Sequence, residues 1–167
     1  GKTFAYLVPA ALFALRNQGE RVAVSTATIH LQEQVAQKDV PLLRRALEAA
    51  GVTPRLEAVV VKGRGNYVSL RRAAEAAALD VSSSDEERSD VARLARWAAE
   101  TRTGDRAELV PQPVGEAWEQ VESQADNCLG ARCPTFERCH YFEARRAAAR
   151  AHVLIVNHHL LFSDLAI

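Results

Sequence analysis

The 167-residue sequence has no methionine, only three lysines and no long hydrophobic run. Average usage would place about three methionines in a chain of this length, and the first residue is a glycine. We therefore expect an internal piece of a longer protein. Because no stretch of about 18 consecutive apolar residues occurs, we expect no membrane-spanning segment. The remaining composition, 48% hydrophobic and 25% charged, is typical of one globular domain or of a domain with an insertion.

Cysteine is also scarce, and its number is odd. The three cysteines form a C-x4-C-x5-C cluster at Cys128, Cys133 and Cys139. A secreted disulfide domain usually has an even and dispersed set, so the cluster favours metal ligands in a reducing compartment. Three thiolates leave a fourth ligand open. The candidates for it are His140, His152, His158 and His159. A zinc site with three cysteines and one histidine, and buried structural cysteines, are the alternatives.

The formal net charge of zero conceals an uneven distribution along the chain. Residues 62–72 contain four basic side chains and no acid, whereas residues 80–126 contain twelve acids against five arginines. Residues 128–150 again favour arginine, five against two glutamates. This order suits a protein that meets an anion with part of its surface. Solvated helix faces would explain any one of these runs alone.

Hydrophobic patterning predicts an α/β fold built on a parallel sheet. Short β-branched runs predict strands at residues 21–25, 56–61 and 152–157. Apolar residues at helical spacing predict helices at residues 4–16, 28–37, 40–50, 68–79 and 142–151, with further helices beginning at Ser84, Trp118 and His158. Ser84 and Glu87 have the spacing of a capping box, while glycines and prolines make residues 101–115 a loop.

The strand-forming regions enclose a mostly helical stretch. We therefore expect residues 1–62 and 152–167 to share one sheet domain, and residues 63–151 to form a helical insertion that carries the cysteines.

Three segments have the residue types that contact phosphates. Gly1-Lys2-Thr3 precedes an apolar helix, where a helix N-terminus, a lysine and a hydroxyl can hold nucleotide phosphates and Mg²⁺. Ser25-Thr26-Ala27-Thr28 leaves a strand and enters a helix, so its hydroxyls can bind phosphate oxygens or simply cap the helix. The segment from Lys62 to Tyr67 (KGRGNY) combines two cations, two glycines and an aromatic ring, which suits single-stranded nucleic acid as well as a tight turn.

Taken in order, these segments resemble one family. The pieces are GKT before FAYLVPA, then VAVSTATIHLQEQV, VVVKGRGNYVSL, CLGARCPTFERC and ARAHVLIVNHHLLF. Together they resemble the first helicase domain of DinG/XPD-type superfamily 2 DNA helicases, and the cysteine spacing is closer to the bacterial DinG branch. The resemblance implies a RecA-like domain, ATP and Mg²⁺ as cofactors, a [4Fe–4S] cluster in the insertion, and 5′→3′ translocation on single-stranded DNA. It also implies unwinding of DNA forks, a role in DNA repair, and a monomer in the bacterial cytoplasm.

The resemblance assigns roles residue by residue. Gly1, Lys2 and Thr3 match the ATP-phosphate and Mg²⁺ residues. The motif that grips the DNA backbone is matched by Ser25, Thr26 and Thr28, and we also assign DNA contacts to Lys62, Arg64, Asn66 and Tyr67. Three cluster ligands are matched by Cys128, Cys133 and Cys139. The family's remaining cysteine stands where this sequence has Ser69.

A serine oxygen is a poorer iron ligand than a thiolate, so Ser69 predicts a weakened cluster. A site filled by zinc, an empty site, or another fourth ligand are the alternatives. The family's acidic ATPase box and second motor domain are expected beyond residue 167, so we expect the chain alone neither to hydrolyse ATP nor to unwind duplex.

Two other functions fit the same sequence. A metal-stabilised module that binds single-stranded DNA without ATP would need no acidic box in the residues that follow. A nucleotide-binding regulatory domain would have no affinity for single strands, so a salt-dependent DNA titration separates it from the other two.

Overall fold

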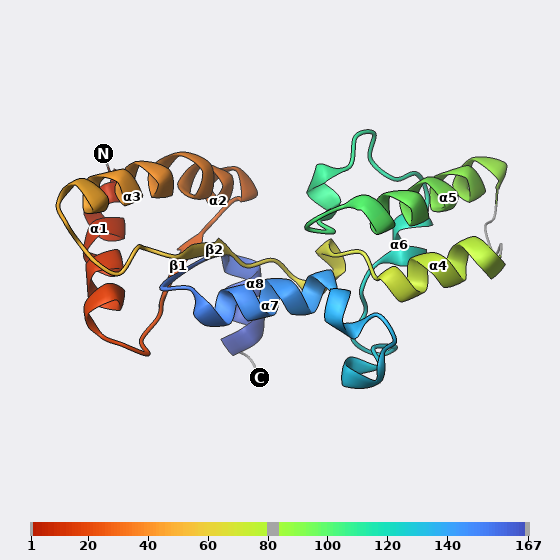
Figure 1. Ribbon diagram of the computed structural model, residues 1–167. Helices are drawn as coiled ribbons and strands as arrows, with labels where there is room; N and C mark the ends of the chain where they lie inside the picture. The colour runs from red at the N-terminus through yellow and green to blue at the C-terminus, as the bar shows by residue number, and fades with distance from the viewer. Residues whose placement is uncertain (1, 80–83, 166–167) are drawn as a thin grey trace. The chain divides into compact units, whose positions relative to one another are not determined.

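The computed structural model describes residues 2–79 and 84–165, and the chain divides into two compact units (Figure 1). Unit one comprises Gly1–Lys62 and Arg145–Ile167, and unit two comprises Gly63–Ala144. Helix α7 (His140–Arg150) runs through the position at which the units divide. No helix in the described ranges has the length and apolar character needed to cross a membrane.

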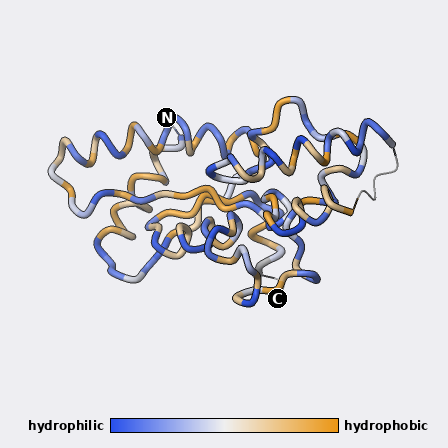
Figure 2. The backbone as a smooth tube through the Cα atoms, turned by 45° about the vertical axis from the view of Figure 1, so that its right-hand side comes forward, coloured by the Kyte–Doolittle hydropathy of each residue, from blue (hydrophilic) through white to orange (hydrophobic). Residues whose placement is uncertain are grey.

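Unit one contains a parallel sheet of three strands in the order β1-β3-β2. The strands are β1 (Val22–Thr26), β2 (Ala58–Val60) and β3 (Val153–Asn157). The last strand in the chain therefore lies in the middle, with Val24 beside Ile155 on one side and Val60 beside Ile155 on the other. Figure 2 shows these strands as mostly orange, hydrophobic segments. The predicted α/β class with a parallel sheet is confirmed.

One face of this sheet carries the core of unit one. Helix α1 (Lys2–Arg16) directs Leu7, Ala11 and Leu15 into that core, although Pro9 lies inside the helix on its exposed side. Val24 and Ile155 meet these residues from the strands, because alternate residues of a strand point to the same face. The opposite face carries Ala23, Leu154 and Val156, which line a cavity together with residues of α7 and of α8 (His158–Leu165).

The segment after β1 is one helical run rather than the two separate helices that we predicted. Helix α2 (Ile29–Gln34) passes through a π-helical turn, η1 (Val35–Asp39), directly into α3 (Val40–Ala49). Pro41 stands at the start of α3 and has no amide hydrogen, so it cannot donate to the carbonyl one α-turn earlier. The wider π-turn, in which the amide of Val40 bonds to the carbonyl of Val35, accommodates this defect without ending the helix.

Unit two is helical and has its own core around Trp118, which is 2% exposed. Its longer helices are α4 (Leu70–Leu79), α5 (Asp85–Glu100) and α6 (Ala117–Val121). The described residues of unit two also form four short 3-10 turns, of which one precedes α4, one lies between α5 and α6, and two follow α6: η2 (Arg64–Asn66), η3 (Arg106–Glu108), η4 (Gly130–Arg132) and η5 (Phe136–Arg138). The Ser84 hydroxyl accepts from the amide of Glu87 at the start of α5, as the capping pattern predicts.

The indole nitrogen of Trp118 donates to the carbonyl of Gly65 at 2.8 Å, so the helical core is tied directly to the KGRGNY segment. The guanidinium of Arg72 donates to the carbonyls of Glu119 and Glu122 and thereby holds the end of α6.

Candidate functional site

Lys2 and Thr3 are the first residues of α1, with the lysine exposed and the threonine half-buried. Gly1 lies outside the described residues. In Figure 1, α1 and β1 run in opposite directions, so α1 starts toward the end of the sheet at which β1 finishes. The amides of a first helical turn have no partners within the helix and favour negative charge. The two side chains are thus placed where a phosphate could be held.

The Ser25–Thr28 segment leaves β1 at this same end, and its hydroxyls have different partners. Thr28 is the N-cap of α2, and its Oγ1 accepts from the amide of Leu31 at 3.2 Å. The Thr26 hydroxyl is buried and lies 3.2 Å from the carbonyl of Thr28. Ser25 Oγ instead lies 2.6 Å from Nδ1 of His158, the first residue of α8. The hydroxyls of Thr26 and Thr28 therefore have main-chain partners within the fold, while the hydroxyl of Ser25 contacts a side chain.

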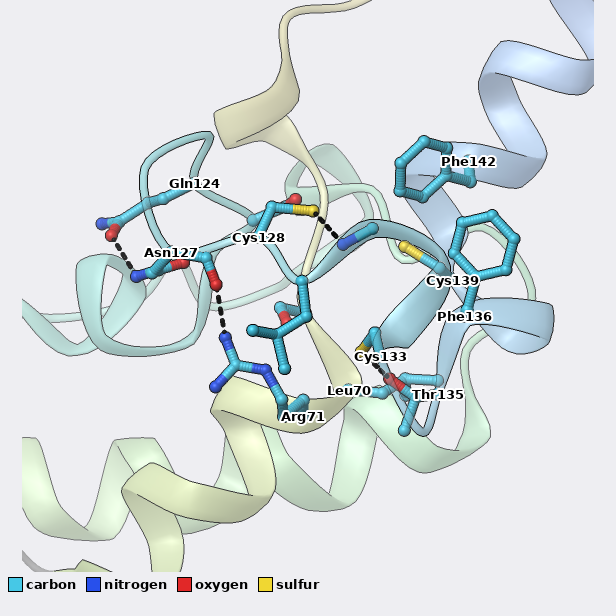
Figure 3. Close-up of a pocket in the computed structure, with 14 residues that line it drawn as sticks. Leu70, Arg71, Gln124, Asn127, Cys128, Cys133, Thr135, Phe136, Cys139 and Phe142 are labelled. Carbon is cyan, nitrogen blue, oxygen red and sulfur yellow. Dashed lines mark hydrogen bonds between the residues drawn. The ribbon is translucent and has the colours of Figure 1, made fainter.

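The cysteine cluster surrounds a pocket in unit two. All three cysteines and Ser69 line it, although Ser69 is far from them in sequence. Figure 3 shows the cysteines on the loops that follow Asn127, with Phe136 and Phe142 forming one wall. These two rings pack at 4.8 Å between centroids. The structure thus brings the four positions of the predicted ligand set to one place.

Backbone pairing fixes the position of Ser69 at this pocket. The amide of Val68 donates to the carbonyl of Gly104, and the amide of Ser69 donates to that of Val121. Ser69 then precedes α4, where its Oγ accepts from the amide of Arg72 at 3.4 Å. The neighbouring Arg71 donates to the carbonyl of Asn127 and so ties α4 to the loop that carries Cys128 (Figure 3).

The Cys128 thiol has the most polar surroundings of the cluster. The amide of Gly130 donates to its sulfur at 3.4 Å, and this bond lowers the pKa of the Cys128 thiol. The guanidinium groups of Arg64 and Arg71 lower the pKa further, because positive charge favours the thiolate. Cys133 Sγ lies 3.3 Å from the Thr135 hydroxyl. The pocket is therefore suited to negatively charged sulfur.

All three cysteines are free thiols, and within the described ranges no group of three or more histidine, cysteine or acidic side chains is arranged to hold a metal ion. The donor set nevertheless fits a thiolate-bound iron–sulfur group in kind, because three sulfurs and one hydroxyl line the same pocket beside cationic side chains. Among the histidines, His140 is in unit two, and burial lowers its pKa. His152 and His158 belong to unit one, as does the exposed His159.

The KGRGNY segment is built into unit two more firmly than its composition suggests. The Arg64 guanidinium lies 3.9 Å above the ring of Tyr141, a cation–π contact. Tyr67 is 6% exposed and meets Tyr141 edge-on at 6.1 Å, so its ring is part of the core. Asn66 is exposed but donates to the carbonyl of Gly63, closing the turn. Lys62 is half-buried at the end of unit one.

Three contributors to these sites had no clear sequence signal. Arg71 and Asn127 shape the cysteine pocket through a main-chain bond, which leaves no pattern in the sequence. The sequence suggests His158 only as a candidate metal ligand. Its bond to Ser25 leaves no local pattern, because the two residues are 133 positions apart. The sequence does show that this histidine directly follows a buried strand. Because the ends of parallel strands meet at one edge of a sheet, that position would place it near the residues at the end of the first strand.

Comparison with known proteins places the whole chain within larger helicases. It is 34% identical over 171 residues to "ATP-dependent DNA helicase YoaA" of Haemophilus influenzae, covering 100% of this chain and 25% of that protein. It is 36% identical over 168 residues to the protein of that name in Escherichia coli, again covering 100% and 25%. It is 39% identical over 180 residues to "ATP-dependent helicase DinG" of Mycobacterium tuberculosis, covering 98% and 26%. No protein-family model matches the chain.

The resemblance to DinG-type helicases is therefore confirmed, since the similarity covers the whole chain. The chain spans about a quarter of the length of the curated relatives that it matches.

Proposed function

We propose that this chain is the nucleotide- and DNA-contacting part of the first motor domain of a DinG-like ATP-dependent DNA helicase. The observation that carries the proposal is the similarity over the whole chain to proteins named as ATP-dependent helicases. Unit one supplies the sheet of this RecA-like domain, and unit two is its cysteine-containing insertion. The function belongs to a monomeric protein of the bacterial cytoplasm that acts in DNA repair.

In unit one, Lys2 and Thr3 bind the phosphates of ATP and its Mg²⁺. Their support is their place at the start of a 15-residue helix, where the lysine charge, the hydroxyl and the helix dipole act on the same phosphate group. Gly1, which the resemblance assigns to the same phosphate site, lies outside the described residues. Hydrolysis needs acidic and water-positioning groups in addition to these three residues.

The DNA path uses hydroxyls and cations that contact the backbone of a single strand. Ser25, Thr26 and Thr28 stand at the end of β1, and the amides at the start of α2 add to them. Lys62 of unit one and Arg64 and Asn66 of unit two supply charge and polar contacts to the strand. Tyr67 contributes by holding the KGRGNY turn in place, because its ring is buried in the core. The strand is travelled in the 5′→3′ direction at DNA forks.

The pocket in unit two holds an iron–sulfur cluster. Cys128, Cys133 and Cys139 are its thiolate ligands, and Ser69 occupies the place of the fourth. When bound, such a cluster crosslinks the loops that carry its ligands and so stiffens the insertion. Arg64 and Arg71 offset the negative charge of the thiolates. The serine makes the fourth position the weak point of this site.

Two measurements test the proposal. Titration of a fluorescent oligothymidylate with the 167-residue chain should show binding that falls steeply as salt rises, because phosphate contacts release counterions. A longer protein that contains the chain should unwind a forked duplex with a 5′ tail in the presence of ATP and leave a 3′-tailed duplex intact. Absence of single-strand affinity at low salt would contradict the DNA role. ATP-independent binding without unwinding would instead favour the metal-stabilised binding module.

A further inference from the structure

The side chains of Ser25 and His158 meet at the end of the sheet where β1 and β3 finish. Ser25 Oγ lies 2.6 Å from His158 Nδ1, and both side chains are half-buried. Ser25 is paired with Val156 across the two strands, so it faces the side of the sheet on which α8 begins. The contact is therefore fixed by strand register and by the start of a helix.

The histidine is itself held in place by its neighbours. Asn157 Oδ1 accepts from the amide of Leu160 at 2.7 Å, which caps the first turn of α8. The imidazole lies 6.0 Å from the ring of Phe162, centroid to centroid. The cap fixes the start of α8, and the imidazole lies between Ser25 and the ring of Phe162 in its contacts.

The polarity of this bond decides what Ser25 can do. If the serine hydroxyl donates to Nδ1, its hydrogen is used and only oxygen lone pairs remain, which repel a phosphate. If Nδ1–H donates, the hydroxyl hydrogen is free for another acceptor. Thr26 already lies within hydrogen-bond distance of two carbonyls, those of Thr28 and Val156. Thr28 Oγ1 accepts from the amide of Leu31, which leaves its hydrogen available, whereas the availability of the Ser25 hydrogen depends on the direction of its bond to His158.

We propose that His158 is a positioning residue for nucleic-acid binding: its Nδ1–H donates to Ser25 Oγ and turns the serine hydroxyl outward as a donor to a backbone phosphate of single-stranded DNA. The inference rests on the proposed single-strand binding of unit one. It assigns to His158 a role in DNA contact instead of metal ligation. The effect passes through Ser25 and needs no contact between the imidazole and DNA.

The test is a set of variants of the 167-residue chain, titrated against labelled oligothymidylate at one low salt concentration. We expect Ser25→Ala and His158→Ala each to weaken binding about ten-fold, the lower end of the range for one hydrogen bond to a charged group. The double variant should lose no more than either single one, because both remove the same bond. His158→Asn should keep most of the affinity, since its Nδ2–H replaces the Nδ1–H donor. His159→Ala is the matched control and should bind like the parent chain, because His159 is exposed and next in sequence.

A second measurement reports the bond without DNA. Long-range proton–nitrogen NMR of the free chain at pH above 7.5 should show His158 as the Nδ1–H tautomer, and circular dichroism should show all variants folded. Unchanged affinity of His158→Ala, additive losses in the double variant, or an Nε2–H tautomer would overturn the inference while leaving the proposed function standing. A parent chain that does not bind single strands would instead overturn the proposed function, and the DNA role of His158 with it.

Discussion

At the scale of single residues, Tyr67 shows how burial changes the role of a side chain. Burial raises the pKa of its phenol to about 12, and the negative charges of Asp105 and ionised Tyr141 add to the effect. Below pH 10 the phenol is protonated in both the folded and the unfolded chain, so stability is unaffected. Between pH 10 and 12 the unfolded chain loses the proton first, and stability falls as the pH rises.

This sign gives a testable pH dependence. Between pH 9 and pH 11 the free energy of unfolding should fall by about 1 kcal/mol because of Tyr67 alone. Urea unfolding at the two pH values measures the change, and Tyr67→Phe should remove that part of it. Tyr6→Phe, at a ring that is 46% exposed, serves as the control. An equal pH dependence in Tyr67→Phe and the parent chain would contradict the burial of this phenol.

Position 104 requires glycine because of its backbone conformation and because of the nearby ring of His140. It has φ of +65°, and a Cβ there would lie 2.5 Å from the ring of His140. We expect Gly104→Ala to lower the free energy of unfolding of unit two by about 3 kcal/mol, from strain and overpacking together. Gly115→Ala is the control, because φ is +49° but no atom lies within 4 Å, so it should cost about 1 kcal/mol. Equal losses would show that the contact with His140 does not matter.

Ser69 stands at the position where the resemblance leads us to expect the fourth cysteine ligand. Ser69→Cys places a fourth sulfur at the pocket and should increase the iron retained per chain after anaerobic reconstitution, with stronger visible absorption. Ser89→Cys on the exposed side of α5 adds a thiol away from the pocket and should change neither quantity. Iron content and absorbance measured side by side decide the question. Stoichiometric zinc in a colourless protein, or no response to Ser69→Cys, would contradict the assignment.

At the scale of elements, the pattern of apolar residues predicted most helices and all three strands, because burial on one face leaves a period in the sequence. The prediction of two helices between β1 and β2 was wrong, since a π-turn before Pro41 leaves no such period. The strand predicted at residues 56–61 is shorter in the structure, where β2 is Ala58–Val60, because hydrophobicity does not fix where a strand ends.

The candidate sites also differed in how far the sequence could predict them. The cysteine cluster is recognisable in the sequence because its three cysteines are close together along the chain. The Ser25–His158 bond is not, because its two residues meet only through the order of the strands.

Thr28 caps the N-terminus of α2, so its side chain should contribute to stability. Its Oγ1 accepts from the amide of Leu31, one of the unpaired donors of the first turn of α2. Thr28→Ala should therefore lower the free energy of unfolding by about 1 kcal/mol, whereas Thr28→Ser keeps the oxygen and should stay close to the parent chain. Chemical denaturation with a probe in unit one measures both. Full stability of Thr28→Ala would show that the cap contributes nothing.

At the scale of the whole molecule, the division into two units predicts which part of the chain loses protection from hydrogen exchange when metal is removed. Each unit has its own hydrophobic core, and the cysteine pocket lies wholly within unit two. Removal of iron from reconstituted protein with a chelator should increase amide hydrogen exchange in the loops of residues 124–139 and leave the strands of unit one unchanged. Mass spectrometry of peptides from both units measures this. Increased exchange in β1 and β3 to the same degree would contradict independent units.

The position of β3 has a consequence for the order in which the chain acquires its structure. Among the three strands of this sheet, the middle one is the last in the chain, and β1 and β2 each pair with β3 rather than with each other. All of unit two is made before that strand. Its helices form mainly local contacts, which close quickly, whereas the sheet must wait for a partner that is distant in sequence. We therefore expect the helical unit to complete during synthesis before β3 joins β1 and β2 in this sheet.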